Sequence, residues 1–232
     1  GDVYKRQADN TVEILKYTGT ESNVTIPDKI DNKVVKTLGA ESFTENETVV
    51  GVTIPAQVTN LQYGAFASCT NLKKVTFAQG SQLKKIKEET FEHCQKLEEI
   101  HIPDSVTQIE KGAFYYCRSL SKLTLGKKLE VIDNNAFEGC SSLKQIEIPD
   151  SVESIGEGAF TYCTSLEHVT IGNKLAYVAK SAFSWCNLTE ITWGDGIAKI
   201  GDSAFACNQK LTTVSILSLI HISEPTRQEA IS

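Results

Sequence analysis

The residues best suited to metal or redox chemistry are seven cysteines, and their spacing is regular. Metal-binding knuckles need close pairs such as Cys-x-x-Cys, and the sequence has none. One cysteine in each repeat of the chain is typical of a small buried residue stacked in a ladder. Like-pointing side chains on parallel coils also disfavour the dihedral angle of a disulfide. We therefore expect reduced, buried thiols and no metal site at Cys69, Cys94, Cys117, Cys140, Cys163, Cys186 and Cys207.

Acid–base or nucleophilic catalysis would need side chains that converge, and the sequence shows no such set. His93, His101 and His168 fall at variable positions, and none has the spacing to a serine, cysteine or carboxylate that is typical of a triad. The "GDG" of residues 194–196 lacks the lysine and the strand–loop–helix setting of a phosphate-binding loop. We therefore expect no catalytic residue, no cofactor and no enzyme activity.

Charge and hydropathy exclude two further classes of partner. The formal net charge is −6, and the residues that we exclude below contribute equal numbers of acids and bases. An acidic surface argues against nucleic acid as a partner. No apolar run approaches membrane-spanning length, so we expect no membrane insertion by this chain.

The cysteines belong to a repeat that dominates the chain. Each of the first six follows a phenylalanine by three residues, usually in the motif Ala-Phe-x-x-Cys. The repeated phenylalanines are separated by 23, 25, 23, 23, 23, 23 and 22 residues, and a constant period of this length indicates stacked units. They are Phe43, Phe66, Phe91, Phe114, Phe137, Phe160, Phe183 and Phe205.

One repeat, "SLKQIEIPDSVESIGEGAFTYC", indicates how each unit folds. Ile146 and Ile148 alternate with polar residues, which predicts a short strand with one buried face. The Pro-Asp-Ser that follows favours a turn, and "GEGAF" leads into a short helical or irregular turn. A single unit buries too little apolar surface to fold alone. We therefore predict an α/β-type repeat solenoid with short parallel strands, about 23 residues per coil and about eight coils.

The phrases "IPDSVTQIEKGAFYYC" and "IPDSVESIGEGAFTYC" resemble the BspA-like leucine-rich repeats, a family of bacterial and protist surface proteins. The resemblance covers nearly all of residues 11–216. It departs locally: two residues are extra near "AQGSQLKK", one is missing near Asn187, and Cys207 comes one place early. The resemblance implies a leucine-rich repeat fold, a cell-surface or extracellular location and adhesion to host components or other cells.

The two ends of the chain lie outside this pattern. "GDVYKRQ" can be written in codons whose reverse complement reads "LSLIHIS", which is the sequence of residues 217–223. The string resembles translated transposon-end and adapter DNA from sequencing libraries. We therefore predict that residues 1–7 and 217–232 are not native and that the solenoid occupies residues 8–216. Because the sequence has no methionine and hence no start codon, we expect this piece to be an internal fragment of a longer protein.

Two rows of residues on the predicted solenoid are candidate binding surfaces. The first row flanks the inward apolar residues of the strands; it is polar and mixed in sign, and it fits either a binding face or a merely solvated one. Its candidate ligand-binding residues are Glu99, His101, Lys122, Gln145, Glu147, His168 and Glu190. The second row lies two residues after the repeated phenylalanine and includes His93, Tyr116, Tyr162 and Trp185. Exposed tyrosine and tryptophan are common anchors for protein and sugar ligands, although these rings can instead pack over the turn of the neighbouring coil.

These observations predict a non-catalytic interaction module that binds an unidentified protein or glycan through an extended face of the solenoid. The alternative function is an accessory or spacer repeat region of a larger surface enzyme.

Overall fold

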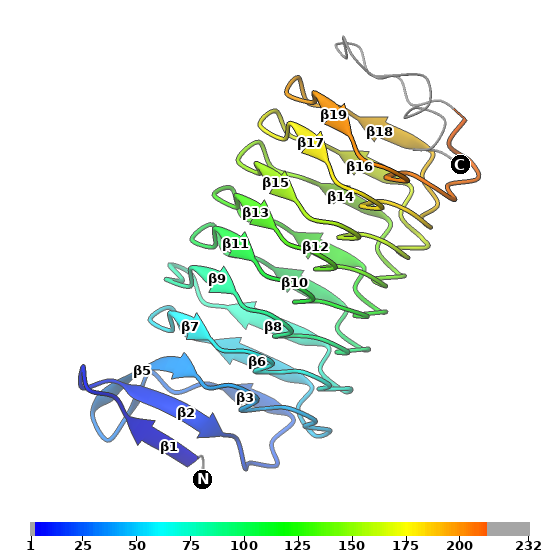
Figure 1. Cartoon of the computed structure of the whole chain (residues 1–232). Coiled ribbons are helices and arrows are strands. Elements are labelled where there is room, and N and C mark those ends of the chain that lie inside the picture. Colours follow the sequence, from blue (N-terminus) through cyan, green and yellow to red (C-terminus); the bar gives the residue numbers. More distant parts are fainter. Residues whose placement is uncertain (1–2, 213–232) are drawn as a thin grey trace.

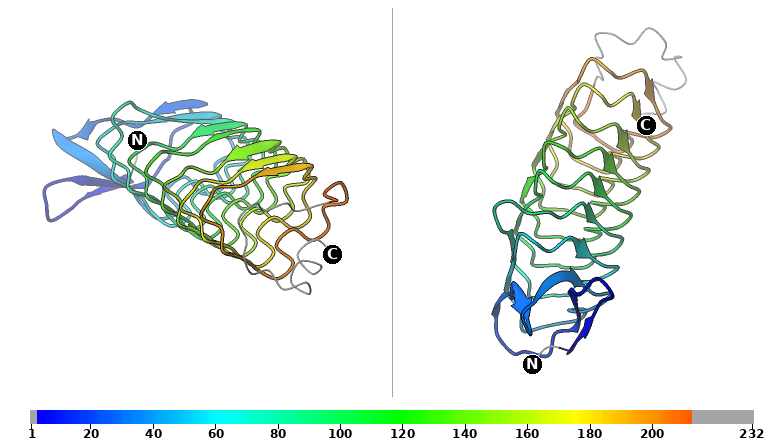
Figure 2. Two further views of the ribbon diagram at one scale, coloured as in Figure 1. Left: turned by 90° about the horizontal axis from the view of Figure 1, so that it is seen from above. Right: turned by 90° about the vertical axis from the view of Figure 1, so that its left-hand side faces the viewer.

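The computed structural model describes residues 3–212 as a solenoid of about eight stacked coils (Figure 1). The views of Figure 2 show the coils superimposed along one axis, with β1 (Val3–Arg6) and β2 (Val12–Lys16) at one end. At the other end lie β18 (Glu190–Thr192) and β19 (Lys199–Ile200). The predicted stacking and its period of about 23 residues are confirmed.

One side of the solenoid is an eleven-stranded sheet to which each coil adds a short strand. Pairing along the stack is parallel, except that β1 pairs with β2 and β4 (Lys29–Ile30) pairs with β5 in antiparallel fashion. The remaining strands are β5 (Lys33–Leu38), β7 (Asn60–Leu61), β9 (Lys85–Ile86), β11 (Gln108–Ile109), β13 (Val131–Ile132), β15 (Ser154–Ile155) and β17 (Tyr177–Val178).

A second side carries the strands that the Leu-x-x-Ile-x-Ile pattern predicts. Here the pairing is parallel and in register, so that equivalent residues of successive coils lie side by side. The ladder is divided into a five-stranded and a three-stranded sheet, because β12 and β14 are not paired. The strands are β3 (Asn23–Thr25), β6 (Gly51–Ile54), β8 (Lys74–Phe77), β10 (Glu99–His101) and β12 (Lys122–Thr124), then β14 (Gln145–Glu147), β16 (His168–Thr170) and β18.

The third side consists of turns, and within residues 3–212 there is no helix, so the α/β class was wrong. The reason lies in the backbone on either side of each phenylalanine. The residues two before and two after it have a positive φ, for example Asn135 at 56° and Gly139 at 75°. Left-handed residues four positions apart cannot belong to a right-handed helix. Instead, backbone N–H groups bond alternately within the turn and to the next coil, as Ala136 N does to Asp133 O and Phe137 N to Ala159 O.

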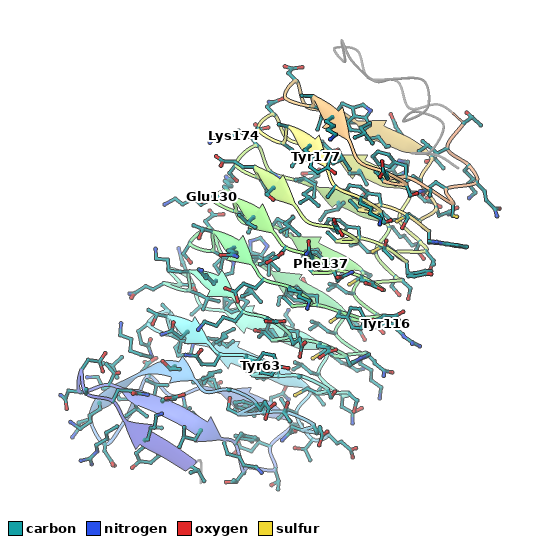
Figure 3. All side chains as sticks on the ribbon, viewed as in Figure 1. Tyr63, Tyr116, Glu130, Phe137, Lys174 and Tyr177 are labelled. Atoms are coloured by element: carbon teal, nitrogen blue, oxygen red, sulfur yellow. The ribbon has the colours of Figure 1, made fainter. Side chains whose placement is uncertain are left out.

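The core of the solenoid is a continuous stack of aromatic rings. Successive repeat phenylalanines are at most 2% exposed, and their ring centroids lie 4.8 to 5.6 Å apart. Tyr17 extends the stack beyond Phe43 at 4.7 Å, and Trp193 meets Phe205 edge-on at 5.7 Å. Figure 3 places Phe137 in the interior, between Tyr116 on one side and Glu130 on the other. Offset stacking stabilises such rings by about 0.5–1.5 kcal/mol per pair beyond the burial of their area.

The cysteines form a second internal ladder beside the rings. All seven are free, and six are buried. Each buried Sγ lies 3.0 to 3.4 Å from the backbone carbonyl of the phenylalanine in the preceding coil, as Cys69 does to Phe43 and Cys140 to Phe114. The thiols therefore satisfy carbonyls at the ends of the turns. Burial raises the pKa of the Cys69 and Cys186 thiols to about 12.

Asn208 completes this ladder in the last described coil. It stands three residues after Phe205, where the six preceding coils have cysteine, and it is 5% exposed. Its Nδ2 donates to Phe183 O at 2.9 Å and to Phe205 O at 2.8 Å. Cys207, by contrast, is partly exposed. The early cysteine of this coil is therefore no shift in register, because an amide performs the role of the thiol.

The two ends that we excluded from the solenoid differ in what can be described. Val3–Arg6 form β1 and pair with β2, so they extend the sheet by one strand. Residues 217–232 lie outside the described residues. The origin of both ends stays a prediction.

Candidate binding surfaces

The strand ladder presents its polar residues outward, as the alternation predicts. Ile100, Ile146 and Val169 point inward and are only 1 to 3% exposed. The polar residues on either side of them point to solvent. Glu99 is half-buried; the exposed members are His101, Lys122, Gln145, Glu147, His168 and Glu190. Their role in binding stays a prediction.

Charges along this ladder partly neutralise one another between coils. Lys74 Nζ lies 3.5 Å from Glu99 Oε2, and Lys73 Nζ lies 3.9 Å from Glu98 Oε1 beside it. His168 Nδ1 lies 3.8 Å from Glu190 Oε2, which makes an ion pair only when the imidazole is protonated. Exposed pairs of this kind contribute about 0–1 kcal/mol to stability. The strand face therefore offers no patch of uniform sign to a charged partner.

A groove of about 730 Å³ lies on this face where the sheet is divided between β12 and β14. Its lining combines threonine hydroxyls with amide and carboxylate groups from four successive coils. Residues along it include Thr124, Gln145, Glu147, Thr170, Thr192 and Trp193. The groove thus brings together Gln145 and Glu147 of the predicted set, whereas Glu99 and His101 lie outside its lining.

The second row forms what we call the aromatic edge, namely His93, Tyr116, Tyr162 and Trp185. The rings are arranged as two stacked pairs. His93 and Tyr116 have centroids 5.7 Å apart at 30°, and Tyr162 and Trp185 have centroids 5.8 Å apart at 24°. Gly139 occupies the coil between the two pairs.

The two pairs differ in how much ring they leave free. A Cβ at Gly139 would lie 2.9 Å from the ring of Tyr116, so Tyr116 leans over the turn of the next coil. Arg118 also lies over this ring, with its Cζ 5.2 Å from the centroid. Tyr162 and Trp185 remain 42% and 51% exposed. Tyr116 therefore packs over the turn of the neighbouring coil, whereas Tyr162 and Trp185 keep a large accessible surface.

The backbone at the aromatic edge is strained. His93, Tyr116, Tyr162 and Trp185 all have φ between 55° and 58°, a left-handed conformation that bulky residues rarely adopt. A left-handed residue with a side chain costs about 1–2 kcal/mol relative to one in the right-handed region. Glycine fills the same position in one coil, as Gly139. Sequence reasoning identified the row but missed this strain, for which Gly139 was the one available signal.

Two features are absent from the described residues, namely a group of metal-ligating side chains and a membrane-spanning helix. Within residues 3–212 no three His, Cys, Asp or Glu side chains are grouped so that they could hold a metal ion. The same range contains no helix that is long and apolar enough to cross a membrane.

Comparison with known proteins assigns the family. Residues 14–144 and 130–226 match the BspA type Leucine rich repeat region in six copies. The chain belongs to the BspA-type leucine-rich repeat family. In the described residues, this BspA-type chain has no helix. Its coils are held together by the parallel strands, the phenylalanine stack and the cysteine ladder.

Solved structures of bacterial leucine-rich repeat proteins are similar to this BspA-type chain. The T. pallidum Leucine Rich Repeat protein is 25% identical with a TM-score of 0.65, and the match covers 94% of this chain and 96% of that one. A leucine rich cell surface protein from Faecalibacterium prausnitzii is 30% identical with a TM-score of 0.58, over 88% and 71%. The pneumococcal vaccine antigen PcpA, at 19% identity and a TM-score of 0.61 over 90% and 80%, shares the fold. No curated protein matches the chain.

Proposed function

We propose that this chain is a non-catalytic module of a cell-surface or secreted protein, and that it adheres to host or cell-surface components through an extended face of the solenoid. Membership of the BspA-type family supports this location and an interaction role. A similar structure is described as a cell surface protein. The partner is a protein or a glycan.

The observation that carries the proposal is the exposure of the stacked rings of Tyr162 and Trp185. Half-exposed rings contribute little to the core, and glycine at the same register, as in Gly139, avoids the strain. Every described coil has a left-handed residue at this position, so the conformation belongs to the fold, and it is the presence of two large exposed rings there, where glycine also fits, that supports a binding role. Tyrosine and tryptophan are also enriched where proteins bind partners.

Binding of the full chain to immobilised matrix proteins, mucins and glycans tests the proposal. The test variant is Tyr162→Gly with Trp185→Gly, which removes both rings and leaves a residue that suits the backbone. The control is Tyr63→Ala with Tyr177→Ala, because these tyrosines are equally exposed, at 44% and 42%, but lie elsewhere on the solenoid. We expect saturable binding that the test variant loses and the control keeps.

Two results would count against adhesion through the aromatic edge. Equal binding by both variants would move the site to another face. No binding to any of these surfaces by the folded chain would favour the second function, an accessory or spacer repeat region of a larger surface enzyme.

A further inference from the structure

A smaller groove of about 360 Å³ runs beside the aromatic edge across three successive coils. Tyr162 and Trp185 form one wall. The other wall consists of residues that come three before the repeat phenylalanine, and the floor consists of small residues that come directly after it. These are Asn134, Glu157 and Lys180 on the wall, and Thr161 and Ser184 on the floor.

The groove depends on the size of its floor residues. Thr161 and Ser184 are buried, and their hydroxyls lie 2.6 Å apart. In the two preceding coils the same register carries Glu138 and Tyr115. The Tyr115 ring contacts His93 and Tyr116, with centroids 5.6 and 4.6 Å away. The change from large to small side chains therefore opens the groove beside Tyr162 and Trp185.

Asn134 and Asn135 line the end of the groove toward the N-terminus. Asn135 Nδ2 donates to Glu138 Oε2 at 2.6 Å, which holds the Glu138 side chain across the turn. Burial raises the pKa of the Glu138 carboxyl. The lining of the groove contains no residue before Asn134, so the groove does not continue along the whole aromatic edge.

The polar wall offers hydrogen-bonding groups that the protein itself leaves unused. In the described part of the chain, neither the Glu157 carboxylate nor the Lys180 ammonium has a side-chain partner. Asn134 Oδ1 accepts from Glu157 N at 2.8 Å, which fixes the amide and leaves its Nδ2 available. A carboxylate that accepts, an ammonium that donates and an amide that donates together match hydroxyl groups, which do both.

Shape and chemistry select the class of ligand. The volume lies near the lower end of the range of about 300–1,000 Å³ for small-molecule sites. A protein partner needs about 800 Å² on each side, well beyond this groove. Aromatic rings on one wall favour a ligand with an apolar face, and the opposite wall favours hydroxyls. A pyranose ring has both.

We propose that this groove binds a carbohydrate, as one pyranose residue packed against the Tyr162–Trp185 pair with its hydroxyls toward Glu157 and Lys180. The inference rests on the proposed function, because it gives the ligand class of the aromatic edge. The sugar that binds there is a terminal or an internal residue of a glycan.

Tryptophan fluorescence tests the inference directly. The chain has two tryptophans, so Trp193→Phe leaves Trp185 as the only one. The titrants are free galactose, N-acetylglucosamine, N-acetylneuraminic acid, lactose and chitotriose. We expect a saturable change of Trp185 emission with at least one of them. No saturable change with any of the five sugars would overturn the inference.

Two variants in the same background locate the site. Thr161→Tyr introduces the residue that an earlier coil has at this register, Tyr115, and fills the groove. We expect this variant to weaken sugar binding at least about tenfold. The control Thr161→Ala leaves the groove open and should retain sugar binding. Glu157 is exposed, so Glu157→Ala removes one hydrogen-bond acceptor without disturbing the core, and we expect the affinity for sugar to fall about tenfold. Circular dichroism verifies the fold of each variant. If Thr161→Tyr and Glu157→Ala both bind sugar as tightly as the parent, the groove is not the site.

The failure of this inference is distinguishable from that of the proposed function. If the rings are needed for binding to a matrix protein but no sugar binds, the carbohydrate inference fails and the adhesion proposal stands. If a sugar binds in the groove while no matrix protein or mucin does, the carbohydrate inference stands and adhesion to those surfaces fails.

Discussion

The buried thiol ladder makes the stability of this protein sensitive to alkaline pH. Burial raises the pKa of the Cys69 and Cys186 thiols to about 12 and holds those of the other four buried cysteines well above their usual range. In an unfolded chain the thiol pKa is about 8.5. A group whose pKa is raised by folding contributes stability that is fully present below its unfolded pKa and lost as the pH rises toward its folded pKa.

The expected loss is large because the six thiols act together. At pH 10, about 1.5 units above the unfolded pKa, each thiol lowers the free energy of unfolding by about 2 kcal/mol. Six thiols then remove about 12 kcal/mol, which is comparable to the entire stability of a typical domain at about 5–15 kcal/mol. We therefore expect cooperative unfolding between about pH 9 and pH 10.5.

Urea unfolding, followed by circular dichroism with reductant present from neutral pH to pH 10, measures this loss. Cys140→Ser is the matched control, because its hydroxyl can still donate to Phe114 O but does not ionise in this range. Whatever this substitution costs at pH 7, it should reduce the loss of stability at pH 10 by about 2 kcal/mol. A free energy of unfolding that stays flat to pH 10, or an unchanged pH slope in Cys140→Ser, would refute the reasoning.

Three further predictions concern the backbone, the core and the last coil. Tyr162→Gly should be more stable to urea than Tyr162→Ala by about 1 kcal/mol, because φ is positive there. At Tyr177, on β17, the order should reverse by about 0.5–1 kcal/mol, and the same order at both sites would contradict the strain argument. Phe137→Ala should cost about 3–5 kcal/mol in thermal unfolding, since it leaves a cavity in the ring stack; a cost below about 1 kcal/mol would contradict the tight packing. Asn208→Ala should cost about 1–3 kcal/mol in urea unfolding by leaving Phe183 O without its donor, and no loss would mean that this amide does not complete the ladder.

The turn around each phenylalanine shows where local sequence signals were insufficient. A short helical or irregular turn was compatible with "GEGAF", and the structure has a turn with two left-handed residues. Glycine marks such residues at Gly112 and Gly158, but Glu89 and Asn135 occupy the equivalent position in other coils. The conformation is imposed by hydrogen bonds to the next coil, so no single repeat reveals it.

The last coil shows a related limit in reading side-chain roles. Cys207 was an irregularity in the cysteine pattern, and Asn208 had no assigned role. Asn208 satisfies two carbonyls with one amide. A thiol and an amide can be recognised as equivalent here only from the structure, which shows that both donate to the carbonyl of a repeat phenylalanine in the preceding coil.

The sequence by itself determined the period, the inward residues and the parallel stacking of the coils. A unit of 23 residues with Leu, Ile, Ala and Phe at constant places can bury them only by repeating the same path, and repetition places equal residues above one another. Tertiary structure alone decided which aromatic side chains are covered and where a groove opens. Tyr116 leans over Gly139 while Tyr162 and Trp185 remain exposed, because exposure depends on the size of the residue in the adjacent coil, and that neighbour is more than twenty positions away in the chain.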